Sequence, residues 1–258
     1  MTRQIAYFSM EVAIAPEVPT YSGGLGVLAG DVARTAADLK IPMVVVTLLH
    51  RKGYFTQRID AQGYQSEEPV NWEAKKYLQE IKQRASVELE GRTVYLRAWR
   101  YDIVGVTGFK VPVYFLDTDL PENSEEDRVL THHLYGGDIR YRLCQEAIFG
   151  IGGVRMLRVL GYEGLSRFHM NEGHASLLTL ALLDGEARSA DKPSFTQEEI
   201  DQVRKKCVFT THTPVSAGHD RFPMALVDQV LERKEIGVMR DLFCLNGDLD
   251  LTHIAVNF

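Results

Sequence analysis

A Gly-Gly-Leu-Gly turn between an apolar run and an Ala-rich stretch is the feature that most constrains the fold of this chain. Residues 5–10 form an apolar run typical of a buried strand, and the turn follows at Gly23 to Gly26. Apolar residues then recur at helical spacing over residues 27–39, so the glycines lie at the beginning of a helix. A strand, a glycine turn and a helix in this order are typical of α/β folds.

Later segments predict more strands, one long helix and a hairpin. Residues 43–49 form a β-branched run of the kind that is buried on both faces of a parallel sheet. A helix is predicted over residues 143–160, although three glycines weaken it. In residues 87–103 polar and apolar residues alternate, which predicts an antiparallel hairpin that forms an insertion or a sheet edge. The remaining predicted strands are residues 111–116, 166–170 and 206–210.

These elements predict one Rossmann-like domain over residues 1–258, with a parallel sheet flanked by helices and a β-hairpin insertion near 87–103. Residues 184–199 have the composition of a solvated connection, and residues 251–258 resemble an unfinished helix that lacks a cap. We therefore expect further chain beyond the last residue.

Composition and charge exclude several classes of protein. The 258 residues are 45% hydrophobic and 25% charged, which is ordinary for a folded domain. The net charge is −6 with no basic stripe, so no nucleic acid is expected as a partner. The three cysteines lack metal-binding spacing and are typical of reduced thiols. No apolar run in the sequence approaches the roughly 20 residues that a membrane helix requires. We expect a cytoplasmic protein with no membrane partner.

Ligands of open α/β sheets bind beyond the carboxyl ends of the strands, and the glycine turn is a candidate for such a site. Without Cβ atoms at Gly23 and Gly24, a ligand can approach the backbone, and the N–H groups of Gly23, Gly24 and Leu25 can hold an anion at the helix N-terminus. The alternative is a tight turn that only packs a helix on the sheet.

Two other polar clusters follow predicted strands. The first runs from Asn171 to His174 and offers an amide, a carboxylate and an imidazole to sugar hydroxyls. Its alternatives are a helix cap made by Asn171 or Glu172 and a satisfied, half-buried His174. A metal on Glu172 and His174 is not expected, because no third ligand is near in sequence.

The second cluster contains Thr211 and His212, and His219 follows it. We expect His219 to be a solvent-facing residue without a partner. The loop that precedes a helix at Asp138 is either a gate over the site or a cap supplied by the Asp138 carboxylate.

These segments, in this order, resemble the α-glucan phosphorylases, particularly the shorter bacterial and archaeal type. The matching segments are residues 5–11, 19–31, 169–174 and 209–214. The resemblance implies the N-terminal domain of a two-domain, glycosyltransferase-B-type fold. It also implies phosphorolysis of an α-1,4-glucan by inorganic phosphate, which gives glucose 1-phosphate with retained anomeric configuration.

The resemblance also implies a role for each matching residue. His212 and Glu172 would be catalytic, and the substrate-binding residues would be Gly23, Gly24, Leu25, Asp138, Asn171, His174 and Thr211. The family's cofactor is pyridoxal 5′-phosphate, held by a lysine of the second domain whose surroundings resemble no segment here. The C-terminal cofactor domain is thus expected to be absent from this chain and to be its partner. We expect the isolated chain to be inactive, and we expect no metal.

Two other interpretations stay open at this point. The chain could be a non-catalytic glucan-binding or regulatory module derived from a phosphorylase. It could also be the N-terminal domain of a glycogen or starch synthase, whose similar glycine turn binds a nucleotide sugar. Those synthases place a lysine just before the glycines, where this chain has Thr20, Tyr21 and Ser22.

Overall fold

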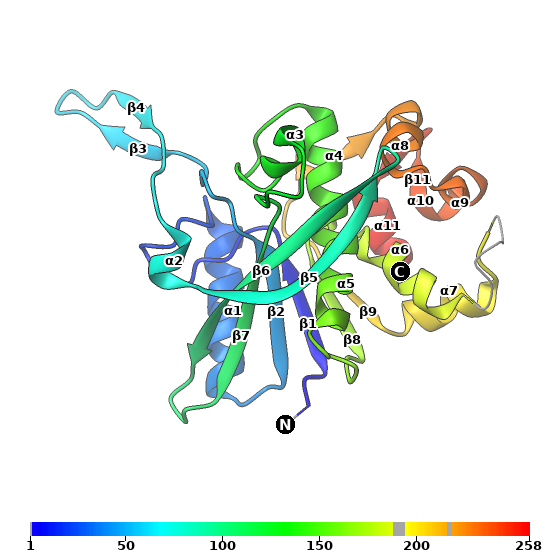
Figure 1. Cartoon of the computed structure of the whole chain (residues 1–258), viewed down its shortest axis with the longest axis horizontal. Coiled ribbons are helices and arrows are strands. Elements are labelled where there is room, and N and C mark those ends of the chain that lie inside the picture. The colour runs from blue at the N-terminus through cyan, green and yellow to red at the C-terminus, as the bar shows by residue number, and fades with distance from the viewer. Residues whose placement is uncertain (1, 188–193, 216–217) are drawn as a thin grey trace.

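A computed structural model of the chain describes residues 2–187, 194–215 and 218–258 and contains a seven-stranded sheet with helices packed against it (Figure 1). The strands are β1 (Ile5–Ser9), β2 (Met43–Leu48), β5 (Gln79–Leu89), β6 (Arg92–Val104), β7 (Lys110–Asp117), β8 (Arg167–Asn171) and β9 (Cys207–Thr210). Their order is β5-β6-β7-β2-β1-β8-β9, and neighbours from β7 to β9 pair in parallel. The predicted α/β fold with a mainly parallel, Rossmann-like sheet is confirmed.

The helical segments connect these strands and cover the sheet. They are α1 (Gly24–Asp38), α2 (Ala74–Tyr77), α3 (Glu125–Arg128), α4 (Ile139–Ala147), the π-helical turn η1 (Ile148–Gly152), α5 (Gly153–Val159), the 3-10 turn η2 (Gly173–Ala175), α6 (Leu178–Glu186), α7 (Gln197–Arg204), α8 (Met224–Leu231), α9 (Lys234–Val238), α10 (Arg240–Phe243) and α11 (Leu251–Asn257). The helix expected over residues 143–160 is present as α4, η1 and α5. A Cβ atom at Gly150 would lie 2.6 Å from the backbone nitrogen of Leu178, so glycine permits η1 to approach α6 closely.

Two hydrophobic clusters lie on opposite faces of the sheet because successive side chains of a strand point to opposite sides. Val45 of β2 packs in one cluster with Ala29 and Ala33 of α1. Val46, its neighbour in sequence, packs in the other cluster with Phe149 of η1. The strand is buried on both faces, as its β-branched sequence predicts.

The predicted antiparallel hairpin is formed by β5 and β6, and it extends the main sheet. β6 pairs with β7, so β5 becomes the edge strand. At the hairpin tip the Glu90 carboxylate accepts hydrogen bonds from Arg140 and Arg92, and its backbone N–H donates to the carbonyl of Val230 at 2.9 Å. The arginine hydrogen bonds, with that of Arg140 first, lower the pKa of Glu90 to about 2. The tip is thus fixed to α4 and to the end of α8.

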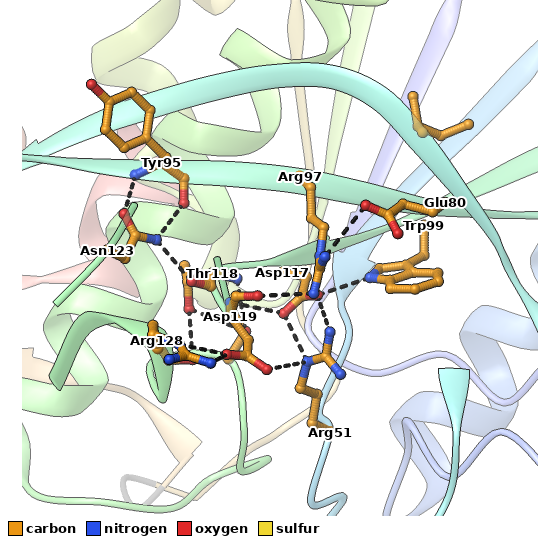
Figure 2. A network of polar contacts seen from close by, with 12 residues as sticks. Arg51, Glu80, Tyr95, Arg97, Trp99, Asp117, Thr118, Asp119, Asn123 and Arg128 are labelled. Carbon is orange, nitrogen blue, oxygen red and sulfur yellow. Dashed lines mark hydrogen bonds and ion pairs between the residues drawn. The ribbon is translucent and has the colours of Figure 1, made fainter. Parts of the chain in front are cut away.

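A buried carboxylate at the end of β7 ties the hairpin to the carboxyl end of β2. Figure 2 shows Asp117 between Arg51 and Arg97, with the indole N–H of Trp99 donating to the same carboxylate at 2.8 Å. Burial opposes ionisation of Asp117, but the arginine contacts prevail and lower its pKa. The polar groups at the end of β7 bond to other side chains of the protein, so this strand end stabilises the fold.

Several small elements have too few residues for a sequence period to reveal them. The hairpin of β3 (Thr56–Ile59) and β4 (Gln65–Glu68) projects from the body of the molecule (Figure 1). A three-stranded sheet is formed by β10 (Arg221–Phe222), β12 (Asp248–Asp250) and β11 (Cys244–Leu245).

The two expectations for the later part of the chain concern α11 and the connection at 184–199. The predicted helix at residues 251–258 is confirmed as α11. α6 and α7 occupy the two ends of the predicted connection, and residues 188–193 lie outside the described residues. Within the described ranges, none of the helices has both the length and the apolar character that a bilayer crossing requires.

Candidate functional site

A cavity of about 590 Å³ lies beyond the carboxyl ends of β1 and β8, beside the first turn of α1. Its lining comes from segments that are far apart in the sequence. The lining residues are Glu11, Gly24, Leu25, Tyr135, Arg142, Glu172, His174, Thr213, Gly218 and Asp220. This is the position where open α/β sheets bind their ligands, so the cavity is the candidate active site.

The glycine turn presents unused backbone donors to this cavity. Gly23 is the N-cap of α1, and the N–H groups of Gly24 and Leu25 donate to no acceptor in the part of the chain that the structure describes. A Cβ atom at Gly23 or Gly24 would meet nothing within 4 Å, whereas one at Gly26 would lie 2.4 Å from Cβ of Tyr21. Packing therefore explains Gly26 but not Gly23 or Gly24, which border open space.

The Glu11 carboxylate holds this turn through hydrogen bonds, a role that was not predicted from the sequence. Its Oε2 atom accepts hydrogen bonds from the N–H groups of Ser22 at 2.6 Å and Gly23 at 3.2 Å. Its Oε1 atom accepts a hydrogen bond from the hydroxyl of Tyr135 at 2.7 Å. The only signal in the sequence is a carboxylate directly after an apolar strand. Glu11 thus joins the end of β1, the glycine turn and the loop before α4.

Glu172 holds the segment after β9. Its Oε1 atom accepts hydrogen bonds from the backbone N–H groups of His212 and Thr213, and its Oε2 atom accepts one from the Thr211 hydroxyl at 3.2 Å. Glu172 adopts a positive φ of 68°. Its carboxylate makes no cap hydrogen bond to η2, so the helix-cap alternative for Glu172 is wrong.

Asn171 connects three strand ends through its buried amide group. The Nδ2 group donates to the Ser9 hydroxyl at 3.1 Å, and Oδ1 accepts a hydrogen bond from Nε2 of His212 at 3.0 Å. An amide oxygen can only accept, so His212 carries its proton on Nε2 when it is neutral. The structure therefore brings Asn171, Glu172, Thr211 and His212 together.

His174 lines the cavity and belongs to a buried charge cluster. Its Nδ1 atom lies 3.0 Å from Oε1 of Glu146 and 3.1 Å from Oδ2 of Asp220. The guanidinium of Arg142 forms an ion pair with the same Asp220 oxygen. Burial alone would lower the pKa of His174, but the contacts with Asp220 and Glu146 prevail and raise it to about 9. His174 is therefore a buried member of an ion-pair network.

Sequence reasoning missed Arg142, Glu146 and Asp220, although Arg142 and Glu146 stand four residues apart on α4, as ion-pairing residues on one helix face do. Ligand atoms of Glu146, His174 and Asp220 lie within 4.8 Å of one another, the spacing of a possible metal site. The Arg142 cation already pairs with Asp220 there. The cluster therefore already contains a cation of its own.

Two further expectations concerned Asp138 and His219. Asp138 is exposed at the N-cap of α4, where its Oδ1 atom accepts a hydrogen bond from the N–H of Tyr141 at 2.8 Å. The capping alternative for Asp138 is thus realised, and its role toward a substrate stays a prediction. His219 is half-buried, and its ring contacts the Thr252 hydroxyl at 2.6 Å and the Thr213 carbonyl at 3.0 Å. The expectation of a solvent-facing histidine without a partner is wrong.

Comparison with known proteins shows relatives along most of the chain, although no protein-family model matches it. It is 39% identical to maltodextrin phosphorylase of Thermococcus litoralis over 93% of this chain and 28% of that protein. It is 40% identical to glycogen phosphorylase of Mycobacterium tuberculosis over 87% of this chain and 27% of that protein. It is 30% identical to glycogen phosphorylase of Aquifex aeolicus over 88% of this chain and 32% of that protein. Along most of its length the chain is thus similar in sequence to maltodextrin and glycogen phosphorylases, and it spans between 27% and 32% of the length of these relatives.

Proposed function

We propose that residues 1–258 are the N-terminal domain of an α-glucan phosphorylase and form one wall of its glucose and phosphate site. The observation that carries the proposal is the pair of unused N–H groups at Gly24 and Leu25, which border the cavity at the beginning of a long helix. Such a helix end favours an anion through its free N–H groups and its dipole. The names of the relatives support inorganic phosphate and an α-1,4-glucan as the substrates.

The charges around the cavity suit an anionic and a hydroxyl-rich ligand together. Arg142 and His174 supply positive charge near the glycine turn. The carboxylates of Glu11 and Glu172 are occupied by hydrogen bonds from the protein, so their charge is partly balanced within the wall. In this proposal Glu172 and His212 act at the sugar, with Glu172 keeping the His212 segment in place.

The cofactor of the proposed enzyme requires groups from outside this chain. Pyridoxal 5′-phosphate supplies a phosphate for proton transfer and is bound through a lysine amine, but no lysine occurs among the residues that line the cavity. The described residues therefore do not fit the cofactor by themselves. We infer that a second domain completes the site and that this chain alone does not phosphorolyse glucan.

A pair of glycine substitutions tests whether the turn binds the phosphate group. Gly24→Ala adds a methyl group that meets no protein atom within 4 Å, and Gly237→Ala in α9 is a matched control with the same free space. Inorganic phosphate or glucose 1-phosphate should shift the amide NMR signals of Gly24 and Leu25 in the wild type and in Gly237→Ala. The shifts should be lost in Gly24→Ala. The absence of these shifts in the wild type would refute phosphate binding at this turn.

Reconstitution tests the activity itself. The chain is mixed with the separately produced C-terminal part of a relative, loaded with pyridoxal 5′-phosphate, and glucose 1-phosphate is measured with maltodextrin and phosphate. We expect product only from the mixture, with the α configuration. A mixture that forms a stable complex but gives no product would favour the glucan-binding module over the enzyme, and product from the chain alone would contradict the need for a second domain.

A further inference from the structure

The two carboxyl groups that meet Nδ1 of His174 stand in different surroundings. Asp220, in the loop before β10, keeps 17% of its side chain exposed and forms an ion pair with Arg142. Glu146 of α4 keeps 1% exposed, and its Oε2 atom is buried without a hydrogen-bond partner in the described part of the chain. An ionised carboxylate with an unpartnered, buried oxygen is costly, whereas a neutral carboxyl group is tolerated more easily.

We propose that Asp220 is the positioning residue of His174: its carboxylate, paired with Arg142, keeps the imidazole protonated on both nitrogens, with Nδ1–H held between Asp220 and a neutral Glu146. The Nε2–H group of His174 then remains free to donate to a ligand in the cavity. The identity of that ligand rests on the proposed function, but the charge state of His174 does not.

The geometry fixes the proton on Nδ1 first. A neutral imidazole with its proton on Nε2 would direct the Nδ1 lone pair at two carboxyl oxygens, 3.0 Å and 3.1 Å away, which is repulsive. A proton on Nδ1 turns both contacts into hydrogen bonds. The hydrogen bond at one ring nitrogen sets the state of the other, so Nε2 is the nitrogen left for the cavity.

The charges of the cluster then favour the second proton of His174, on Nε2. Arg142 and a protonated His174 place two cations beside Asp220, so the Asp220 carboxylate is stabilised from both sides. Burial opposes the ionised form of Asp220, yet its contacts with His174, Glu146 and Arg142 lower its pKa. Burial raises the pKa of Glu146 to about 8, which agrees with a neutral carboxyl group at pH 7.

The other groups around His174 do not change this assignment. The ring of Tyr135 lies 5.8 Å from that of His174, and its hydroxyl is bound to Glu11. On the side of α11, Thr252 faces the segment before His174, and His253 directs its Nε2 atom to the carbonyl of Asp241. The carboxylate of Glu172, in the same segment as His174, is bound to residues 211–213.

The consequence is a second fixed cation in the cavity. His174 in this state is a charged hydrogen-bond donor beside Arg142, and hydrogen bonds from charged donors are stronger than neutral ones. A charged Nε2–H group suits an oxyanion or a polarised sugar oxygen. A neutral His174 with its proton on Nδ1 would instead offer an acceptor at Nε2, which an oxyanion would avoid.

NMR titration of the imidazole nitrogens in the ¹⁵N-labelled chain tests the proposal. The signals of His174 are assigned by their loss in His174→Gln, since the chain has 8 histidines. We expect both nitrogens of His174 to be protonated at pH 7, with a midpoint near the raised pKa of about 9. A wild-type midpoint at or below the ordinary value of about 6.5 would overturn the proposal without any variant.

Two variants separate the carboxyl groups. Asp220→Asn removes the charge and should lower the His174 midpoint by about 1–3 pH units, the size of effect of a close opposite charge. Glu146→Gln resembles the neutral carboxyl group and should lower it much less. Asp228→Asn, on the exposed side of α8, is the control for loss of an acidic charge and should change nothing. A larger fall in Glu146→Gln than in Asp220→Asn would refute the assignment to Asp220.

The outcome is independent of substrate binding. If His174 titrates as expected but phosphate shifts no amide of the glycine turn, the charge cluster is confirmed and the proposed phosphate site fails. If phosphate binds but His174 is neutral at pH 7, the proposed function survives and this inference fails.

Discussion

Removal of the Glu172 carboxylate should release the segment that carries His212. In Glu172→Ala, the backbone N–H groups of His212 and Thr213 lose their shared acceptor, and the Thr211 hydroxyl loses its partner. Each net hydrogen bond contributes about 1 kcal/mol, and water can reach this partly exposed segment. The loss of the two backbone bonds should therefore cost about 2 kcal/mol, with local release as its main effect.

Hydrogen exchange and urea unfolding measure the two parts of this effect. The amide protons of His212 and Thr213 should each exchange about fivefold faster in Glu172→Ala, the factor that corresponds to about 1 kcal/mol for each lost bond. The unfolding free energy should fall by about 2 kcal/mol. Glu172→Gln keeps an oxygen acceptor and should show a smaller effect in both assays. If these two amides exchange at the wild-type rate in Glu172→Ala, Glu172 does not hold the segment.

Three other perturbations test the wall of the cavity and the sheet. Glu11→Ala should lower the unfolding free energy measured in urea by about 2–3 kcal/mol, because two backbone N–H groups lose a buried acceptor. An unchanged urea midpoint of unfolding would contradict this role of Glu11. Asp117→Ala should lower the unfolding free energy by about 3–5 kcal/mol in the same assay, because it leaves Arg51 and Arg97 without their buried partner. A decrease below about 1 kcal/mol would show that this network contributes little to stability. The raised pKa of His174 contributes stability that is complete below pH 6.5 and is lost as the pH rises to about 9, so the contribution of His174 to the unfolding free energy should fall by roughly 3 kcal/mol across that range. This fall should be smaller in Asp220→Asn.

The elements that the sequence predicted are those with a clear hydrophobic period. The β-branched run of β2, the Ala-rich face of α1 and the alternation of β5 and β6 each carry enough residues for the pattern to appear. The strands β10 and β11 have two residues each, so no period exists to detect. Their pairing depends on residues far apart in the chain.

The same limit applies to the candidate site. Gly24, Glu172 and His174 line the cavity as expected, because they follow directly after predicted strands or open a predicted helix. The charge cluster beside His174 was not predicted, since its members Arg142 and Asp220 are 78 residues apart and meet only after folding. An ion pair between such distant residues leaves no trace in local sequence.

The hairpin tip has a consequence for the cavity, although it is far from the cavity in sequence. Glu90 binds Arg140 on α4, and Arg142 on the same helix holds Asp220. The first turn of α4 is therefore held by contacts on two sides, with the edge of the sheet and with the charge cluster. The hairpin of β5 and β6 thus helps to position the helix that carries Arg142 beside the cavity, although the two lie far apart in sequence.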